Sequence, residues 1–406
     1  MRRPLYCRFI IPNSFTPHAE MVKDTGLRQR VNTDGKSEKS APKSFIPPNF
    51  TIKELRDAVP AHCFERDTLR SFVYVVVDLS LIAALFYAAT FIDSLPITLR
   101  YVAWPVYWFL QGIVSTGVWV LAHECGHQAF SPSRTINNTV GFVLHTALLV
   151  PYHSWRISHS KHHKATGHMT RDQVFVPSTR SEMGLAPKKD DDEDHEDSAI
   201  MAAPLVDLGW IFIMLTFGWP AYLLWNASGQ DYGRWTSHFH HWSPIFDAKD
   251  KWEIIASVAG IFATIGALIG ASQVYGSMAV VKFYLIPYLW VNFWLVLITY
   301  LQHTDPQLPH YRNNEWNFVR GALATIDRDY GFILNTAFHH IADTHIAHHL
   351  FSQMPHYHAE EATEAIKKVL GDYYSFDNRP LVSAVWNSWT KCRYVEDEGD
   401  VLLFKN

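Results

Sequence analysis

The stretch AHECGH, residues 122–127, places two histidines four positions apart at the end of a long apolar segment. HSKHH at residues 159–163 and HIAHH at residues 345–349 are similar clusters further along the chain. Positions i, i+3 and i+4 share one face of a helix, so each cluster can direct two or three imidazoles towards one point. The candidate ligands are His123, His127, His159, His162, His163, His345, His348 and His349. Their number, eight, exceeds the four ligands of tetrahedral zinc and the six that one transition metal usually binds. The clusters therefore predict two adjacent metals.

The composition is typical of a membrane protein. Of 406 residues, 48% are hydrophobic and lie in long runs, and the many Trp and Tyr residues suit the two membrane interfaces. A net charge of −4 argues against a polybasic nucleic-acid binder. The four cysteines show no CxxC spacing, which favours reduced, cytosol-facing chemistry over a disulfide framework.

Apolar runs predict where the chain crosses the bilayer. Residues 72–92 and 101–122 are long enough to span it and are joined by a short link, so they predict a helical hairpin that ends at the first histidine cluster. Residues 140–150 are apolar but too short to span, and we expect them to lie in the membrane interface. The second cluster then stays on the same side as the first.

Three further apolar stretches follow, at 205–225, 254–271 and 280–301. If all three crossed, the third cluster would lie across a hydrocarbon core of roughly 30 Å, which metal–imidazole bonds of about 2 Å cannot bridge. We expect 205–225 not to cross, because Gly218 and Pro220 should break its helix. The predicted fold is an all-α integral membrane protein. Four transmembrane helices in two hairpins, plus an interfacial helix, are capped by a cytosolic, helical, histidine-rich di-metal domain.

The flanking segments differ in composition from this unit. We expect residues 1–48 to form a disordered cytosolic tail, because Ser, Lys, Pro and Asp dominate the second half of this segment. The charged run at 188–194 predicts a solvated loop. The membrane domain should therefore extend over 49–398, followed by a C-terminal tail at 399–406.

His303, where the last apolar stretch meets water, is a candidate ninth ligand. Ligand imidazoles must be neutral, and their second nitrogens need carboxylate or carbonyl partners. Candidate partners that are nearby in sequence are Glu124, Asp172, Asp327, Asp329 and Asp343.

The histidines have two other interpretations. HECGH matches the zinc-protease pattern HExxH, but a one-zinc hydrolase needs only one further ligand and leaves both HxxHH clusters unexplained. A metal transporter would carry polar groups inside its spans, whereas Asp78 is the only acidic residue well within a predicted span. Spacing does not choose the metal, because imidazole suits iron, zinc, copper and nickel alike.

Four stretches together resemble the membrane-bound fatty-acyl desaturases, most closely the oleate Δ12 desaturases of fungi and plants: AHECGHQAFS, HSKHHKATGHMTRDQVFVP, YLQHTDP and DTHIAHHLFSQMPHYHAEEA. The resemblance extends from about residue 50 to about residue 398. It implies a non-haem di-iron centre held by the eight cluster histidines and His303. In such enzymes reduced iron activates O2, and the oxidant removes two hydrogens from adjacent carbons of an acyl chain, leaving a cis double bond and water.

The resemblance also implies a substrate and partners. We expect conversion of oleoyl to linoleoyl chains, linked to phospholipid or to CoA, with an ω3 or bifunctional Δ12/ω3 enzyme, or a hydroxylase or acetylenase, as alternatives. The chain contains no HPGG haem motif, so electrons should come from cytochrome b5 and its reductase, with NADH as the source. The expected location is the endoplasmic reticulum membrane, with the clusters facing the cytosol. In one departure, Asp305 of LQHTDP replaces the second histidine of the family's usual LQHTHP.

Overall fold

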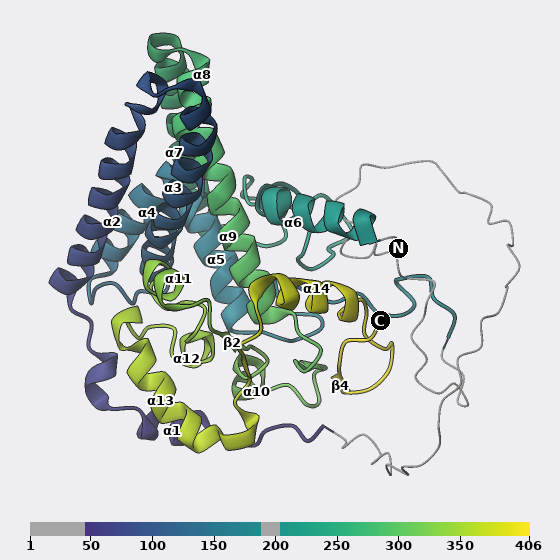
Figure 1. Cartoon of the computed structure of the whole chain (residues 1–406). Coiled ribbons are helices and arrows are strands. Elements are labelled where there is room, and N and C mark those ends of the chain that lie inside the picture. The colour runs from purple at the N-terminus through teal and green to yellow at the C-terminus, as the bar shows by residue number, and fades with distance from the viewer. Residues whose placement is uncertain (1–44, 188–203) are drawn as a thin grey trace, which may run out of the picture.

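The computed structural model describes residues 45–187 and 204–406, and helices dominate it (Figure 1). Residues 1–44 of the expected tail and the charged run at 188–194 lie outside the described residues. Two short strand pairs occur in the part that is described. β1 (His310–Tyr311) pairs antiparallel with β4 (Val401–Leu402), and β2 (Asp327–Arg328) pairs parallel with β3 (Phe376–Asp377).

Two long helical hairpins form the elongated part of the molecule (Figure 1). In the first, α2 (Thr68–Ala89) is followed by the short 3-10 helix η3 (Ile92–Ser94) and by α3 (Ile97–Gly126). In the second, α7 (Lys251–Tyr275) turns at Gly276, whose φ of +85° favours glycine, into α8 (Ser277–Val280), a π-helical turn and α9 (Ile286–His303). The helices expected at 72–92, 101–122, 254–271 and 280–301 are all present.

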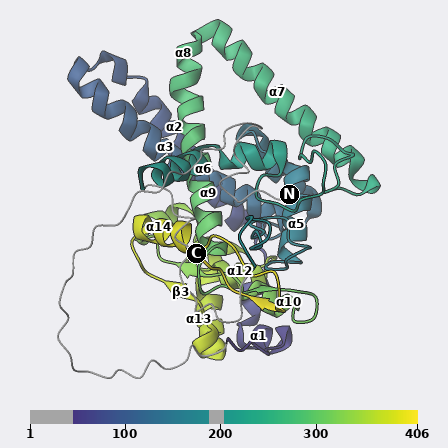
Figure 2. The ribbon, with the colours of Figure 1, turned by 90° about the vertical axis from the view of Figure 1, so that its right-hand side faces the viewer.

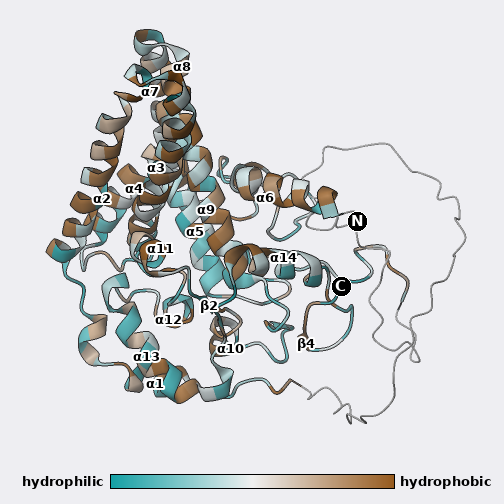
Figure 3. Ribbon diagram, in the orientation of Figure 1, coloured by the Kyte–Doolittle hydropathy of each residue, from teal (hydrophilic) through white to brown (hydrophobic). Residues whose placement is uncertain are grey.

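Five helical stretches of the described residues are long and apolar enough to cross a membrane: Thr68–Ser94, Ile97–Gly126, Pro204–Trp225, Ala248–Tyr275 and Ser277–His303. Hydrophobic residues gather on these helices, whereas the region around α1 and α13 is more hydrophilic (Figure 3). The chain is therefore a largely helical membrane protein.

The expected break at Gly218 and Pro220 is wrong, because α6 (Pro204–Trp225) runs through both residues. Proline removes only one backbone donor, and the helix continues for five residues beyond it with Tyr222 and Leu223 buried in the core. Figures 1 and 2 show α6 lying crosswise to the hairpins, so its orientation, and not an interruption, sets it apart.

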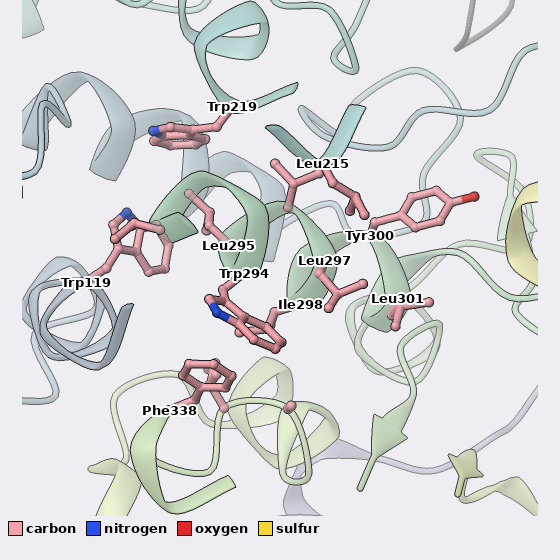
Figure 4. Packing of buried hydrophobic residues seen from close by; sticks show 14 of the residues in the cluster. Trp119, Leu215, Trp219, Trp294, Leu295, Leu297, Ile298, Tyr300, Leu301 and Phe338 are labelled. Carbon is pink, nitrogen blue, oxygen red and sulfur yellow. The ribbon is translucent and has the colours of Figure 1, made fainter. Parts of the chain in front are cut away.

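The main hydrophobic core lies where α3, α6 and α9 meet. Trp119 from α3, Trp219 from α6 and Leu295 from α9 gather there (Figure 4), and the two indole centroids are 6.2 Å apart. Phe338, just after α11 (Phe332–Ala337), packs on Trp294 at 5.3 Å and fastens the segment after α9 to the same core. Buried aromatic contacts of this kind each contribute roughly 0.5–1.5 kcal/mol beyond the area that they bury.

Shorter helices complete the fold around one end of the hairpins (Figure 1). They are α1 (Ile52–Ala58), α4 (Arg134–Ala147), α5 (Tyr152–His163), α10 (Phe318–Ala322), α12 (His345–Leu350), α13 (Ala359–Leu370) and α14 (Leu381–Lys391). The interfacial helix expected at 140–150 begins earlier, as α4, because the hydroxyl of Ser133 caps its first turn.

Both ends of the described chain pack against the region formed by these shorter helices. The carbonyl of Pro48 accepts a hydrogen bond from Arg320 Nε at 2.9 Å. Residues 401–402 form β4, and Leu402 and Phe404 are buried, so the segment assigned to a C-terminal tail belongs to the folded unit. Its backbone pairs with a strand that lies about ninety residues earlier, which no local pattern indicates.

We predict that Gly112→Ala lowers the stability of the α3–α9 pair. A Cβ at Gly112 would overlap Trp290 Cβ of α9, and overpacking of this kind costs about 1–3 kcal/mol. The midpoint of thermal unfolding in detergent, followed by fluorescence-detected gel filtration, should fall. Gly266→Ala in α7 is the control, because a Cβ there meets nothing within 4 Å. Equal midpoints for the two variants would contradict the assignment.

Candidate metal centre

The structure brings all nine predicted histidines into one cluster. His123 lies in the last turn of α3 and His127 caps it, while α5 carries the three imidazoles of the second cluster. His303 is the last residue of α9, and the short helix α12 carries the third cluster. All of them except the partly exposed His159 are buried. The helical spacing of the clusters is confirmed, and their role as ligands stays a prediction.

The imidazoles fall into two adjacent groups. Donor nitrogens of His123, His127, His159, His163 and His348 lie within 4.8 Å of one another. Within this group the Nε2 atoms of His123 and His159 are 3.0 Å apart, those of His123 and His127 are 3.2 Å apart, and those of His159 and His163 are 3.1 Å apart.

The second group contains His162, His303 and His349, whose donor atoms also lie within 4.8 Å. His345 joins it, because its Nε2 is 3.0 Å from His303 Nε2. The groups abut where the rings of His163 and His349 stack, with centroids 4.0 Å apart. Nine imidazoles thus divide into five and four around two neighbouring points, as the ligand count predicts.

The positions of these imidazole nitrogens suit binding to shared metal ions better than hydrogen bonding between the imidazoles. Nε2 atoms of His162, His348 and His349 are buried without a hydrogen-bond partner, although buried polar atoms rarely stay unpaired. Two nitrogens bound about 2.1 Å from one ion and at right angles to each other would lie about 3.0 Å apart, close to the observed spacing. The histidine clusters therefore fit two neighbouring metal ions, and imidazole is a ligand that suits iron.

Burial also keeps these imidazoles in the metal-binding form. Burial, reinforced by the neighbouring imidazoles, holds the pKa of His159, His163 and His348 well below the usual value. Burial lowers the pKa of His345 to about 3. These side chains are neutral at physiological pH, and only neutral imidazole donates a lone pair to a metal.

Asp172 orients His162 through its second ring nitrogen. His162 Nδ1 lies 2.6 Å from Asp172 Oδ1, and the carboxylate also accepts backbone N–H groups of Gly167 at 2.8 Å and Val174 at 3.2 Å. Such an arrangement leaves Nε2 facing the cluster. Uncharged oxygens hydrogen-bond the Nδ1 atoms of two other imidazoles. Ile341 O lies 3.1 Å from His345 Nδ1, and Thr166 Oγ1 lies 3.2 Å from His349 Nδ1.

Of the acidic residues proposed as imidazole partners, only Asp172 hydrogen-bonds a cluster side chain. Asp327 instead accepts the backbone N–H of Ile346 at 2.8 Å and the hydroxyl of Tyr374, so it anchors the start of α12. The remaining three carboxylates have other partners. Glu124 accepts the backbone N–H of His356, Asp329 accepts Nδ2 of Asn335, and Asp343 pairs with the His340 ring. Sequence proximity did not separate these roles, because it does not show which neighbour a carboxylate faces, and the partner of Glu124 lies 232 residues away.

Asp305, the residue that departs from the family pattern, points into an ion-pair cluster. Its Oδ2 lies 2.7 Å from Arg328 Nη2 and 3.0 Å from Arg379 Nη2, and Arg328 also pairs with Asp377. Arg328 is 1% exposed and donates from Nε to Leu301 O at 2.9 Å. This buried arginine fixes the end of α9, and the sequence analysis missed it because nothing in the local pattern marks it.

An apolar cavity reaches the metal-facing imidazoles of both groups. Its walls come mainly from α3, α5, α6 and α9 and include three indoles, Trp119, Trp155 and Trp219. Gly218 lies on this wall opposite Val296, where a Cβ would meet the valine side chain at 3.5 Å.

Fold and site together define a class: a helical membrane protein whose histidine clusters fit a di-iron centre at the end of an apolar cavity. The sequence profile of the fatty acid desaturase family matches residues 102–379, and that of a domain of unknown function (DUF3474) matches residues 13–88. The chain belongs to the fatty acid desaturase family and is a fatty acid desaturase, an oxidoreductase.

Similar proteins cover almost the whole chain. A Delta(12) fatty acid desaturase of Mortierella isabellina is 60% identical over 94% of this chain and 98% of its own length. A Delta(12)-acyl-lipid-desaturase of Punica granatum is 50% identical over 90% and 92% of the two chains. An omega-6 fatty acid desaturase, endoplasmic reticulum isozyme 1, of Glycine max is 47% identical over 92% and 94%.

We predict that Asp172→Ala lowers both iron retention and desaturation. Loss of the carboxylate frees the His162 ring, and removing such a partner typically costs about 10–100-fold in metal affinity or activity. Iron per chain and turnover are measured on the purified variant. Asp172→Asn is the matched control, because its amide oxygen can still accept from Nδ1 and should preserve most of the iron. Full iron and activity in the alanine variant would exclude this role.

Proposed function

We propose that the protein is a Δ12 desaturase that converts oleoyl chains into linoleoyl chains. In this reaction an acyl chain loses one hydrogen from each of two adjacent carbons. With O2, two electrons and two further protons, the products are a cis double bond and two waters. The observation that carries the proposal is the meeting of nine imidazoles, in two groups, with an apolar cavity. Relatives named Delta(12) desaturases, 50–60% identical over most of the chain, support the position of the double bond.

Each part of the site has a task in this reaction. The group containing His123 would hold one iron and the group containing His303 the other, and the irons when bound would supply the O2-derived oxidant. The cavity binds the acyl chain beside them. Its indole and aliphatic walls exclude water, which protects a reactive oxidant from side reactions. Asp172 and Arg328 keep the ligands in place.

The alternatives of the sequence analysis find less support. An ω3 or bifunctional enzyme, or a hydroxylase, would share the ligands, but the relatives at 46–60% identity carry Delta(12) or omega-6 names. A one-zinc protease is disfavoured because the two histidines of HECGH lie among seven further imidazoles. The Δ12 assignment therefore remains the proposal.

The proposed membrane topology has four spans: α2 and α3, then α7 and the continuous α8–α9 segment. The crosswise α6 would lie in the interface, which keeps all histidine clusters at one end of the hairpins (Figure 1). We place that end in the cytosol at the endoplasmic reticulum, a location that appears in the name of the soybean relative. Cytochrome b5 and its reductase, with NADH, would deliver electrons there, and the acyl chain would be linked to phospholipid or CoA.

Expression in a yeast that makes no polyunsaturated fatty acids tests the function. Gas chromatography of its lipids should show linoleate, and His162→Ala, inserted at an equal level, should show none. Supplying linoleate separates the alternatives, because an ω3 or bifunctional enzyme would form a triene. A strain without any diene would overturn the Δ12 proposal.

The acyl cavity predicts a contrast between two glycines of α6. Gly218→Leu would project into the cavity towards Val296, and conversion of oleate should fall by about tenfold or more while iron content stays unchanged. Gly209→Leu should convert oleate normally, since a Cβ there meets nothing within 4 Å. Equal conversion by the two variants would show that the acyl chain does not use this cavity.

A further inference from the structure

A second group of metal-binding side chains lies apart from the nine histidines. His62 and Cys63 belong to the 3-10 helix η2 (Ala61–Phe64). His358 ends another 3-10 turn, η7 (His356–His358), and Glu361 lies in the first turn of α13. Their four ligand atoms, two nitrogens, one sulfur and one carboxylate oxygen, all lie within 4.8 Å of one another. None of these residues belongs to the di-iron site.

The distances between the donors suit one small ion. Cys63 Sγ lies 3.7 Å from His62 Nε2. A zinc ion with Zn–S of about 2.3 Å and Zn–N of about 2.05 Å in tetrahedral geometry places sulfur and nitrogen about 3.6 Å apart. His62 Nε2 and Glu361 Oε2 are 2.8 Å apart, and the rings of His62 and His358 have centroids 5.4 Å apart. A bound ion would replace the hydrogen bond between His62 and Glu361.

The backbone already holds these donors in position. His358 and Glu361 are three residues apart at the start of α13, a spacing that shares one face. Helix α13 in turn packs on α1 through Leu55 and Ile366, which are 0% and 1% exposed. Folding alone already brings residues 63 and 358 together. Binding of an ion therefore carries no further entropy cost for closing this loop, and costs only the ordering of the side chains.

Burial differs among the donors in a useful way. The Cys63 side chain is 0% exposed, whereas the His62 and Glu361 side chains are 53% and 50% exposed, which leaves a path for an ion from solvent. Burial and the neighbouring Glu361 carboxylate raise the pKa of Cys63 to about 11, and a bound zinc ion would stabilise the thiolate form.

We propose that His62, Cys63, His358 and Glu361 form a structural zinc site. It fastens the segment before α2 to α13, the helix that follows the third histidine cluster. The donor set selects the metal class, because thiolate with imidazole favours zinc over the hard cations, and four protein ligands close a tetrahedral site. The cluster of His340, Asp343 and Glu360 near the same helix lacks sulfur and a fourth ligand, and serves as a comparison.

Elemental analysis of the purified full chain, with any affinity tag removed, tests the proposal. We expect one zinc per chain in addition to iron. Cys63→Ser and His358→Ala should each lower zinc affinity by about tenfold or more and leave iron unchanged. Cys392→Ser, which alters another buried cysteine, and His340→Ala, which alters the comparison cluster, should keep the zinc.

Cobalt supplies a readout that does not depend on activity. The protein expressed in cobalt medium should show a thiolate-to-cobalt charge-transfer band that disappears in Cys63→Ser and persists in Cys392→Ser. The exposed variant Glu361→Gln tests the site without opening the core, and should weaken zinc binding at an unchanged elution volume. Zinc-free protein from zinc-supplemented cells, or full zinc content in both Cys63→Ser and His358→Ala, would overturn the proposal.

Discussion

The length of a metal–nitrogen bond, about 2 Å, is the constraint on which the rest of this structure depends. In the proposed centre nine imidazoles from four separate helices reach two neighbouring points, and the ends of α3, α5 and α9 and the short helix α12 come together there. In a membrane protein this also limits topology, because segments that share a metal must end on the same side. In the proposed topology the crosswise α6 lies in the interface, which meets that requirement without shortening the helix (Figure 2).

The surrounding fold holds the imidazoles in place before any ion binds. The buried Arg328 donates to the Leu301 carbonyl and pairs with the Asp305 carboxylate, and these two residues flank His303. Removing one member of a buried ion pair typically costs about 3–5 kcal/mol of stability. Asp327 holds the start of α12 through a backbone N–H. Such support allows a cluster of neutral, buried imidazoles to persist beside an apolar cavity, as the proposed oxygen-activating site requires.

Local patterns predicted the helices and the histidine clusters well, because hydropathy and i, i+3, i+4 spacing are written in contiguous residues. Local patterns did not predict contacts between residues that are far apart in the sequence. The pairing of β4 with β1 and the partners of Glu124 depend on segments up to 232 residues apart. The continuation of α6 through Pro220 also escaped prediction, since packing of Tyr222 and Leu223 outweighs the loss of one hydrogen bond.

Iron per polypeptide in the purified, active protein tests the central claim most directly. Elemental analysis together with Mössbauer spectroscopy of enriched protein should find two irons per chain in neighbouring, nitrogen-rich sites. An alanine at His348 should disturb the first site, and an alanine at His303 the second. A fully active enzyme with one metal per chain, or with zinc and no iron, would contradict the account.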